Sequence, residues 1–112
     1  MIHHMNLNDK PFYNIINGSK RIELRLYDKK RKSISINDTI IFHRVLDENE
    51  TVSVKVIGLL IYNSFEELFN DIDYNISGPA NTLNEKLENI HKIYSYEDEE
   101  KFGILGIRLK KM

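Results

Sequence analysis

Four charged side chains lie close together early in this 112-residue chain, at Lys20, Arg21, Glu23 and Arg25. A basic run, Lys-Lys-Arg-Lys, follows at residues 29–32, so that residues 20–32 hold seven basic and two acidic side chains. A short segment rarely needs this many charges for its own stability. The pattern therefore indicates a site for an anionic, polar ligand, and RNA or a nucleotide is the first candidate.

The charge of the whole chain limits how such a ligand would be held. The formal net charge is −1, whereas a protein that binds nucleic acid mainly through its overall charge is strongly basic. A polyanion is therefore expected to bind at a local patch, and added salt should weaken that binding.

The elements around the charged stretch can be predicted from local patterns. Pro11 fits the first turn of a helix, and Gly18 is a natural helix terminator because it adopts the left-handed conformation without steric cost. Apolar residues at positions 22, 24 and 26 then alternate with charged residues at 21, 23 and 25. This period of two predicts a strand over residues 20–27 with one buried face.

The rest of the chain reads as short strands and helices. The patterns predict strands at 2–7, 39–45, 51–62 and 104–109, a turn at 47–50, and helices beginning at Ser64 and covering 81–94 and 95–101. Gly58 is expected at a bulge or a bend. Without regular strand–helix alternation, this order favours an α+β fold with a mostly antiparallel, partly closed sheet, in one domain spanning residues 1–112.

Several motifs together resemble a known family. They are Pro-Phe-x-x-Ile-x-x-Gly-x-Lys-x-Ile-Glu-x-Arg-Leu at 11–26, x-Asp-Thr-Ile-x-Phe at 37–42, Ser-Phe-Glu-Glu-Leu-Phe at 64–69, and Tyr-Ser-x-Glu with Phe-Gly-Ile-Leu-Gly-Ile at 94–107. In this order and spacing the sequence resembles the ASCH domain (activating signal cointegrator homology). Asn37 stands where that family usually has Gly, but Asn also tolerates a left-handed turn.

The resemblance implies a fold and a site. It implies a PUA-like, mostly antiparallel β-barrel of about five to six strands with flanking helices, and RNA or a nucleotide or nucleoside as ligand. Lys20, Glu23 and Arg25 fall on the motif positions, where the two cations would hold phosphate or a base carbonyl and the carboxylate would accept from a base amino group. The alternative is that they form only a surface ion pair, contributing at most about 1 kcal/mol.

Two further residues are weaker candidates for ligand binding. Tyr27, at the end of the charged strand, is placed to stack on a base, although packing against the core is the simpler role. Arg31 belongs to the basic run, which as a group would guide a polyanion towards the cleft but could equally be a solvated loop.

The residues at the motif positions also leave a hydrolytic activity open. Some small proteins with this domain remove an acetyl group from acetylcytidine, with a Gly-x-Lys-x-x-Thr-x-Arg motif in which Lys and Thr are catalytic. This chain keeps the lysine, as Lys20, but has Glu23 in place of the threonine. A metal-independent hydrolase of modified nucleosides, or a ribonuclease using Lys20 and Glu23 as acid and base, is therefore the alternative to simple binding.

Other functional classes receive less support. The four histidines show no metal-ligand spacing and cysteine is absent, so we expect no metal site and no cofactor. No apolar run is long enough to span a membrane, and no signal peptide is recognisable, so we expect a cytoplasmic protein. The acidic residues 97–100 would suit a protein-interaction surface, but a solvated helix face is the simpler interpretation.

Overall fold

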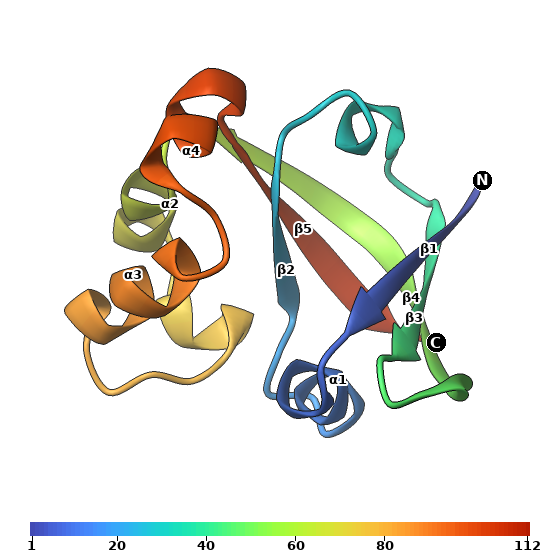
Figure 1. Ribbon diagram of the computed structural model, residues 1–112. Coiled ribbons are helices and arrows are strands. Elements are labelled where there is room, and N and C mark those ends of the chain that lie inside the picture. Colours follow the sequence, from blue (N-terminus) through green and yellow to red (C-terminus); the bar gives the residue numbers. More distant parts are fainter.

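The computed structural model describes residues 1–112, which form one curled sheet with helices at its ends (Figure 1). The strands are β1 (Ile2–Leu7), β2 (Ile22–Leu26), β3 (Thr39–Arg44), β4 (Asp47–Tyr62) and β5 (Ile104–Lys111). The helices are α1 (Asp9–Ile16), α2 (Phe65–Asp71), α3 (Leu83–His91) and α4 (Tyr96–Phe102), with 3-10 turns η1 (Arg31–Ser33) and η2 (Tyr74–Ser77).

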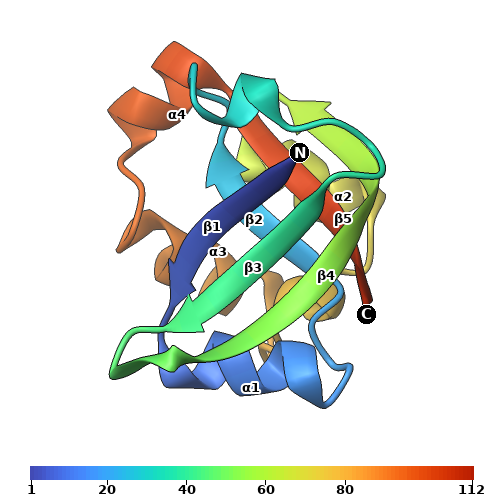
Figure 2. The same cartoon turned by 90° about the vertical axis from the view of Figure 1, so that its right-hand side faces the viewer.

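The sheet is an open half-barrel rather than the barrel expected from the resemblance. Its strand order is β1-β3-β4-β5-β2, so β1 and β2 are the two edges and do not pair with each other. Three of the pairings are antiparallel and the β1–β3 pairing is parallel. Figure 2 shows how the sheet curls, with β1 and β3 in front and β2 and β5 behind. The predicted α+β class and mostly antiparallel sheet are confirmed, with five strands.

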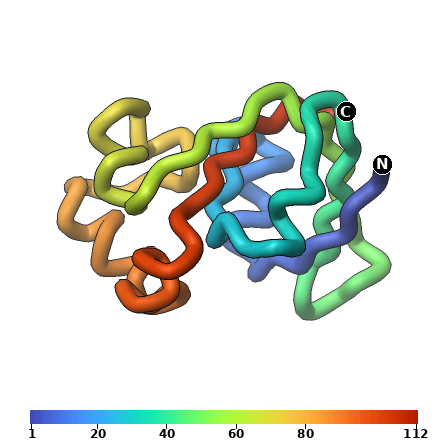
Figure 3. Tube along the Cα trace, turned by 90° about the horizontal axis from the view of Figure 1, so that it is seen from above, coloured from blue at the N-terminus to red at the C-terminus, as the bar shows by residue number.

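Helices cover the half-barrel unevenly. Figures 1 and 3 show α2, α3 and α4 gathered on one side of the sheet, while α1 closes one end of the curl. One apolar cluster, which includes Phe12, Phe42 and Ile107, fills the inside of the curl. A second cluster, which includes Ile22, Phe65 and Leu68, lies between the sheet and the helices. No helix is long and apolar enough to cross a membrane.

Local sequence signals account for most element boundaries. The hydroxyls of Ser64, Thr82 and Ser95 accept hydrogen bonds from backbone N–H groups three residues on, at the starts of α2, α3 and α4. The register of β4 with β5 shifts between Val56 and Gly58, so the predicted bulge is confirmed. Asn37 has a φ of 77°, the left-handed conformation that asparagine tolerates.

Two predictions of local structure are wrong, and one predicted helix is shorter than expected. Residues 47–50 belong to β4, and the turn lies at residues 45–46. The helix predicted over 81–94 covers only Leu83–His91. Glu99 does not lie on a solvated face, because it is only 4% exposed. Its carboxylate accepts a hydrogen bond from the Phe65 backbone N–H (2.6 Å) and pairs with His91 Nε2 (2.7 Å). This carboxylate ties α2, α3 and α4 together.

Strand β2 is buried on both faces, not on one. Ile22 and Leu24 pack in the second cluster, beneath α2. The opposite face carries Glu23, which lies directly across from Ile107 in β5 and so points with it into the concave side of the sheet. The alternation was predicted correctly, but the three helices and the curl of the sheet cover both sides.

The turn at Gly103 provides a test of this fold. Gly103 has a φ of +69°, and a Cβ added there would lie 3.0 Å from the backbone oxygen of Tyr62. Strain and this clash should make Gly103→Ala lower the free energy of unfolding by about 2–3 kcal/mol, measured by urea denaturation. Gly18→Ala is the control, since its φ is +85° but no atom lies within 4 Å, leaving strain of about 1 kcal/mol. Equal losses in the two variants would contradict the packing described at Gly103.

Candidate functional site

The start of β2 is fixed by backbone hydrogen bonds to two other elements. The N–H of Lys20 donates to Asn14 O in α1 (2.9 Å), and the N–H of Arg21 donates to Ile76 O in η2 (2.6 Å). Between α1 and β2 the chain turns at Gly18, whose φ of +85° is accessible to glycine at little cost. These contacts set the position from which the charged side chains of β2 project.

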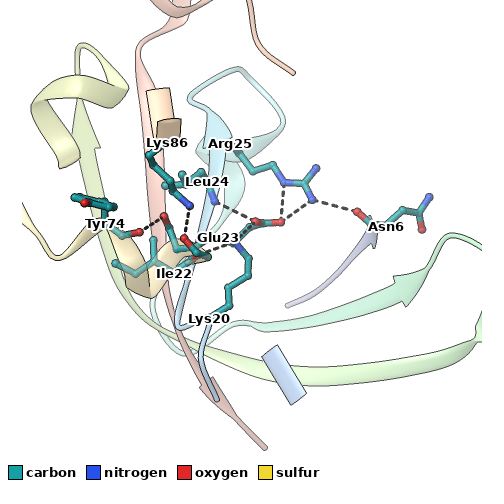
Figure 4. A network of polar contacts seen from close by, with 10 residues as sticks. Asn6, Lys20, Ile22, Glu23, Leu24, Arg25, Tyr74 and Lys86 are labelled. Atoms are coloured by element: carbon teal, nitrogen blue, oxygen red, sulfur yellow. Dashed lines mark hydrogen bonds and ion pairs between the residues drawn. The ribbon is translucent and has the colours of Figure 1, made fainter. Parts of the chain in front are cut away.

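Lys20 is buried and its ammonium group is fully used within the protein. Nζ donates to Ile22 O (3.0 Å) and to Ser77 O (2.7 Å), and it lies 3.2 Å from Glu23 Oε1. An ammonium group has three N–H donors, so these three oxygens account for all of them. Lys20 therefore fastens η2 to β2 and faces the Glu23 carboxylate (Figure 4).

Glu23 is also buried, and its carboxylate is satisfied on both oxygens. Oε1 accepts from the Leu24 backbone N–H (3.1 Å), and Oε2 accepts from Arg25 Nε (3.2 Å) and Nη2 (2.8 Å). Burial alone would raise the pKa of Glu23, but the charges and hydrogen bonds of Lys20 and Arg25 outweigh it and lower the pKa from its ordinary 4.5. The carboxylate is therefore ionised at neutral pH.

Arg25 bridges the opening of the half-barrel. Its Nη2 also donates to Asn6 O in β1 (3.3 Å), across the gap between the two edge strands. Burial by itself would lower the pKa of Arg25, but the neighbouring Glu23 charge and the Tyr94 hydroxyl raise it. Its hydrogen bonds to Glu23 and Asn6 run through Nε and Nη2, and the Tyr94 hydroxyl is a further partner of the guanidinium.

A cavity of about 300 Å³ lies at this opening. Its walls come from β1 and the start of α1, from β2, and from the segment that runs from η2 through α3. The lining residues are Asn6, Leu7, Asn8, Pro11, Lys20, Glu23, Leu24, Arg25, Ser77, Pro79, Lys86, Asn89, Ile90, Ile93 and Tyr94. Among them are three cations and one carboxylate, so the cavity carries an excess of positive charge.

The third cation, Lys86, comes from α3. Its Nζ donates to Gly78 O (2.7 Å), which uses one of its three N–H groups. Burial and the positive charges of Lys20 and Lys10 lower the pKa of Lys86 to about 8, against the opposing attraction of Glu23. The charged ammonium is thus destabilised in this position, and an anion beside it would restore the balance.

This sequence is matched over residues 5–112 by the family model for the ASCH domain. The chain belongs to the ASCH domain family. None of the curated proteins matches it.

Solved structures with this fold include both close and distant relatives of this ASCH domain. The crystal structure of the hypothetical protein PH0355 has 32% identity and a TM-score of 0.88, and each chain covers 100% of the other. The solution structure of protein PF0455 from Pyrococcus furiosus has 29% identity and a TM-score of 0.81, covering 100% of this chain and 98% of that one. An ASCH domain from Lactobacillus crispatus JV V101 shares 14% identity, with a TM-score of 0.65 over 97% of this chain and 79% of its own, and shows the fold alone.

The structure brings three of the predicted site residues of this ASCH domain together and leaves two apart. Lys20, Glu23 and Arg25 line the cavity in one buried chain of contacts, so the alternative of a surface ion pair is wrong. Tyr27 packs against the first apolar cluster beneath the Lys32 ammonium, 5.2 Å from its ring centre. Arg31 pairs with Asp28 Oδ2 (3.2 Å). Neither Tyr27 nor Arg31 lines the cavity.

Sequence reasoning missed several of the polar residues that line the cavity. Lys86 and Asn89 lie on α3, whose apolar spacing predicted the helix but gave no reason to select its polar side. Asn6 and Asn8 flank the junction of β1 and α1. Asn8 occupies the N-cap position of α1, but its side chain makes no capping hydrogen bond. The failed cap was not visible in the sequence.

The histidines lie away from the cavity. His3 Nε2 is 2.8 Å from Asp38 Oδ2, and His4 Nδ1 is 2.8 Å from His43 Nε2. His91 pairs with the buried Glu99. Each histidine is thus engaged with another side chain, and no group of three possible metal ligands gathers around any of them.

The buried chain of charges predicts a pH-dependent loss of stability. Glu23→Gln leaves Lys20 and Arg25 without their counter-ion, which should lower the free energy of unfolding by about 3–5 kcal/mol at pH 7, measured by urea denaturation. Glu97→Gln, on the exposed face of α4, is the control and should change it by less than about 0.5 kcal/mol.

The sign of the pH effect follows from the lowered pKa of Glu23. Its contribution to stability is complete above the ordinary value of 4.5 and is lost as the pH falls through the lower folded-state pKa. The stability difference between the wild type and Glu23→Gln should therefore narrow as the pH is lowered below 4.5. A difference that widens with acid would contradict the described ion pairs.

Proposed function

We propose that this ASCH domain binds RNA or a nucleotide, with a base or phosphate group held in the cavity lined by Lys20, Glu23 and Arg25. The observation that carries the proposal is the cavity's charge: three cations face one carboxylate in a protein of net charge −1. An anionic ligand would neutralise that excess, and partial burial would strengthen the attraction.

Hydrogen-bonding capacity in the cavity is unevenly distributed in a way that suits a ligand. Lys20 and Glu23 are saturated by protein partners, whereas Lys86 donates only one hydrogen bond to the protein and keeps two N–H groups for a ligand. The side-chain amides of Asn6, Asn8 and Asn89 likewise bond to no other protein group. An amide donates and accepts at once, as the edge of a nucleobase does, so these groups favour a base over a simple anion.

The size and apolar walls of the cavity favour a single nucleotide unit. About 300 Å³ lies at the lower end of the range for small-molecule sites. Leu24, Ile90, Ile93 and Tyr94 provide apolar and aromatic surface on which a planar base would pack. A duplex does not fit a cavity of this volume, so the base would enter unpaired.

Binding is better supported than hydrolysis by the same geometry. A catalytic Lys20 would need a free N–H group or lone pair, but its three donors are all used inside the protein. A catalytic Glu23 would need to take up a proton, but its neighbours lower its pKa. We therefore place Lys20 and Glu23 as the residues that position Arg25, and Arg25 and Lys86 as the groups that contact the ligand.

Lys86 offers a test that leaves the buried ion pairs intact. Lys86→Met should weaken binding of a mixture of the four nucleoside monophosphates by about tenfold or more, because a hydrogen bond to a charged group contributes about 1.5–3 kcal/mol. Lys92→Met, at the exposed end of the same helix, should leave the affinity unchanged. Isothermal titration calorimetry gives both affinities. Equal affinity in wild type and Lys86→Met would contradict the proposed site.

The lowered pKa of Lys86 predicts how binding depends on pH. Between about pH 7 and pH 8 Lys86 is charged and affinity should change little, whereas above about pH 8 affinity should fall by up to tenfold per pH unit. The phosphate group is already ionised throughout this range, since its second pKa is about 6. The other groups do not change charge in this pH range. The pKa of Glu23 is lowered, and the pKa values of Arg25 and Tyr94 are raised. The fall in affinity above about pH 8 should be absent in Lys86→Met. If it persisted in that variant, a group other than Lys86 would be responsible for it.

A further inference from the structure

A second cleft lies beside the first and has a different composition. It encloses about 240 Å³ between the end of α1, the residues that lead into β2, the middle of β4 and the end of β5. Its charged residues are Lys20, Arg21, Lys110 and Lys111, and its remaining residues are Ile15, Gly18, Val54 and Leu109. Four cations and no carboxylate line this cleft.

The cations of the second cleft are largely free. The side chains of Arg21 and Lys110 are exposed and form no hydrogen bond or ion pair with the protein. Lys111 Nζ donates to Ile16 O (2.7 Å) at the end of α1 and keeps two N–H groups. The Lys20 ammonium is already paired with Glu23. The other three cations of the cleft have no counter-ion and repel each other, and a bound anion would relieve that repulsion.

The two cavities adjoin at the first residue of the charged stretch. Lys20 lines both. The cavity at the half-barrel opening supplies amides and apolar surface, which suit a base. The second cleft supplies cations without free side-chain amides, which suits a phosphate backbone.

We propose that the ligand is single-stranded RNA longer than one nucleotide, whose phosphate backbone continues from the base-holding cavity into the cleft lined by Arg21, Lys110 and Lys111. This inference rests on the proposed function, and it extends the ligand from a nucleotide to a polymer. A strand held in this way contacts the protein through one inserted base and through phosphates on the far side of Lys20, so its affinity grows with length and falls with salt.

The experiment measures fluorescence anisotropy of labelled, random-sequence single-stranded RNA of two, four, eight and twelve nucleotides, with a nucleoside monophosphate mixture in parallel calorimetry. Affinity is expected to rise at least tenfold between the mononucleotides and eight nucleotides. The double variant Arg21→Ala/Lys110→Ala should remove that gain and leave mononucleotide affinity unchanged. For the longer RNA, the slope of log affinity against log salt concentration should become shallower by about 1.4, at about 0.7 per lost phosphate contact. Both side chains lack protein partners, so the double variant should fold normally.

Lys101→Ala is the matched control, because this exposed lysine on α4 lines neither cavity. Mononucleotide binding that depends on Lys86 but does not strengthen with length would overturn this inference and leave the proposed function standing. Binding of every RNA that is insensitive to Lys86→Met would overturn the proposed function itself. If Lys101→Ala also removed the gain of affinity with RNA length, that gain would come from general surface charge. This result would overturn the role proposed for the second cleft.

Discussion

The arrangement of the site depends on one buried carboxylate. Glu23 lies among apolar groups on the concave side of the sheet, where an unpaired charge costs several kcal/mol. Lys20, Arg25 and the Leu24 N–H together offset that cost, and in doing so they fix both cations. A buried ion pair adds little net stability over an apolar replacement, so its effect here is orientation. It holds Arg25 in place at the wall of the cavity.

The cavity beside Arg25 exists because the sheet is open. Because β1 and β2 are unpaired edges, the cavity forms where a closed barrel would have continued its hydrogen bonding, and one hydrogen bond from Arg25 to Asn6 crosses the gap. The segment from η2 to α3 then covers the opening and contributes Lys86. Figure 4 shows Lys86 approaching the buried chain of charges from the side opposite Asn6. Groups from β1, β2 and α3 meet there.

Local patterns in the sequence were sufficient to predict strand β2 but not the cavity beside it. The alternation in residues 20–27 identified the strand and its charged face, because it depends only on neighbours in the chain. Lys20, Glu23 and Arg25 were selected as site residues by the resemblance to the ASCH domain. Lys86 lies more than sixty residues away, and its place in the cavity depends on how α3 packs. The burial of Glu99 and the unpaired edge strands likewise follow from tertiary contacts that no local period encodes.

A crystal structure of the protein with a bound nucleoside monophosphate would test the central claim most directly. We expect the nucleotide to lie between β1, β2 and α3, with a ligand oxygen within hydrogen-bond distance of the Arg25 guanidinium or Lys86 Nζ. The contacts among Lys20, Glu23 and Arg25 should be unchanged. A nucleotide bound outside this cavity, or one that draws Lys20 away from Ile22 O and Ser77 O to contact the ligand, would contradict it.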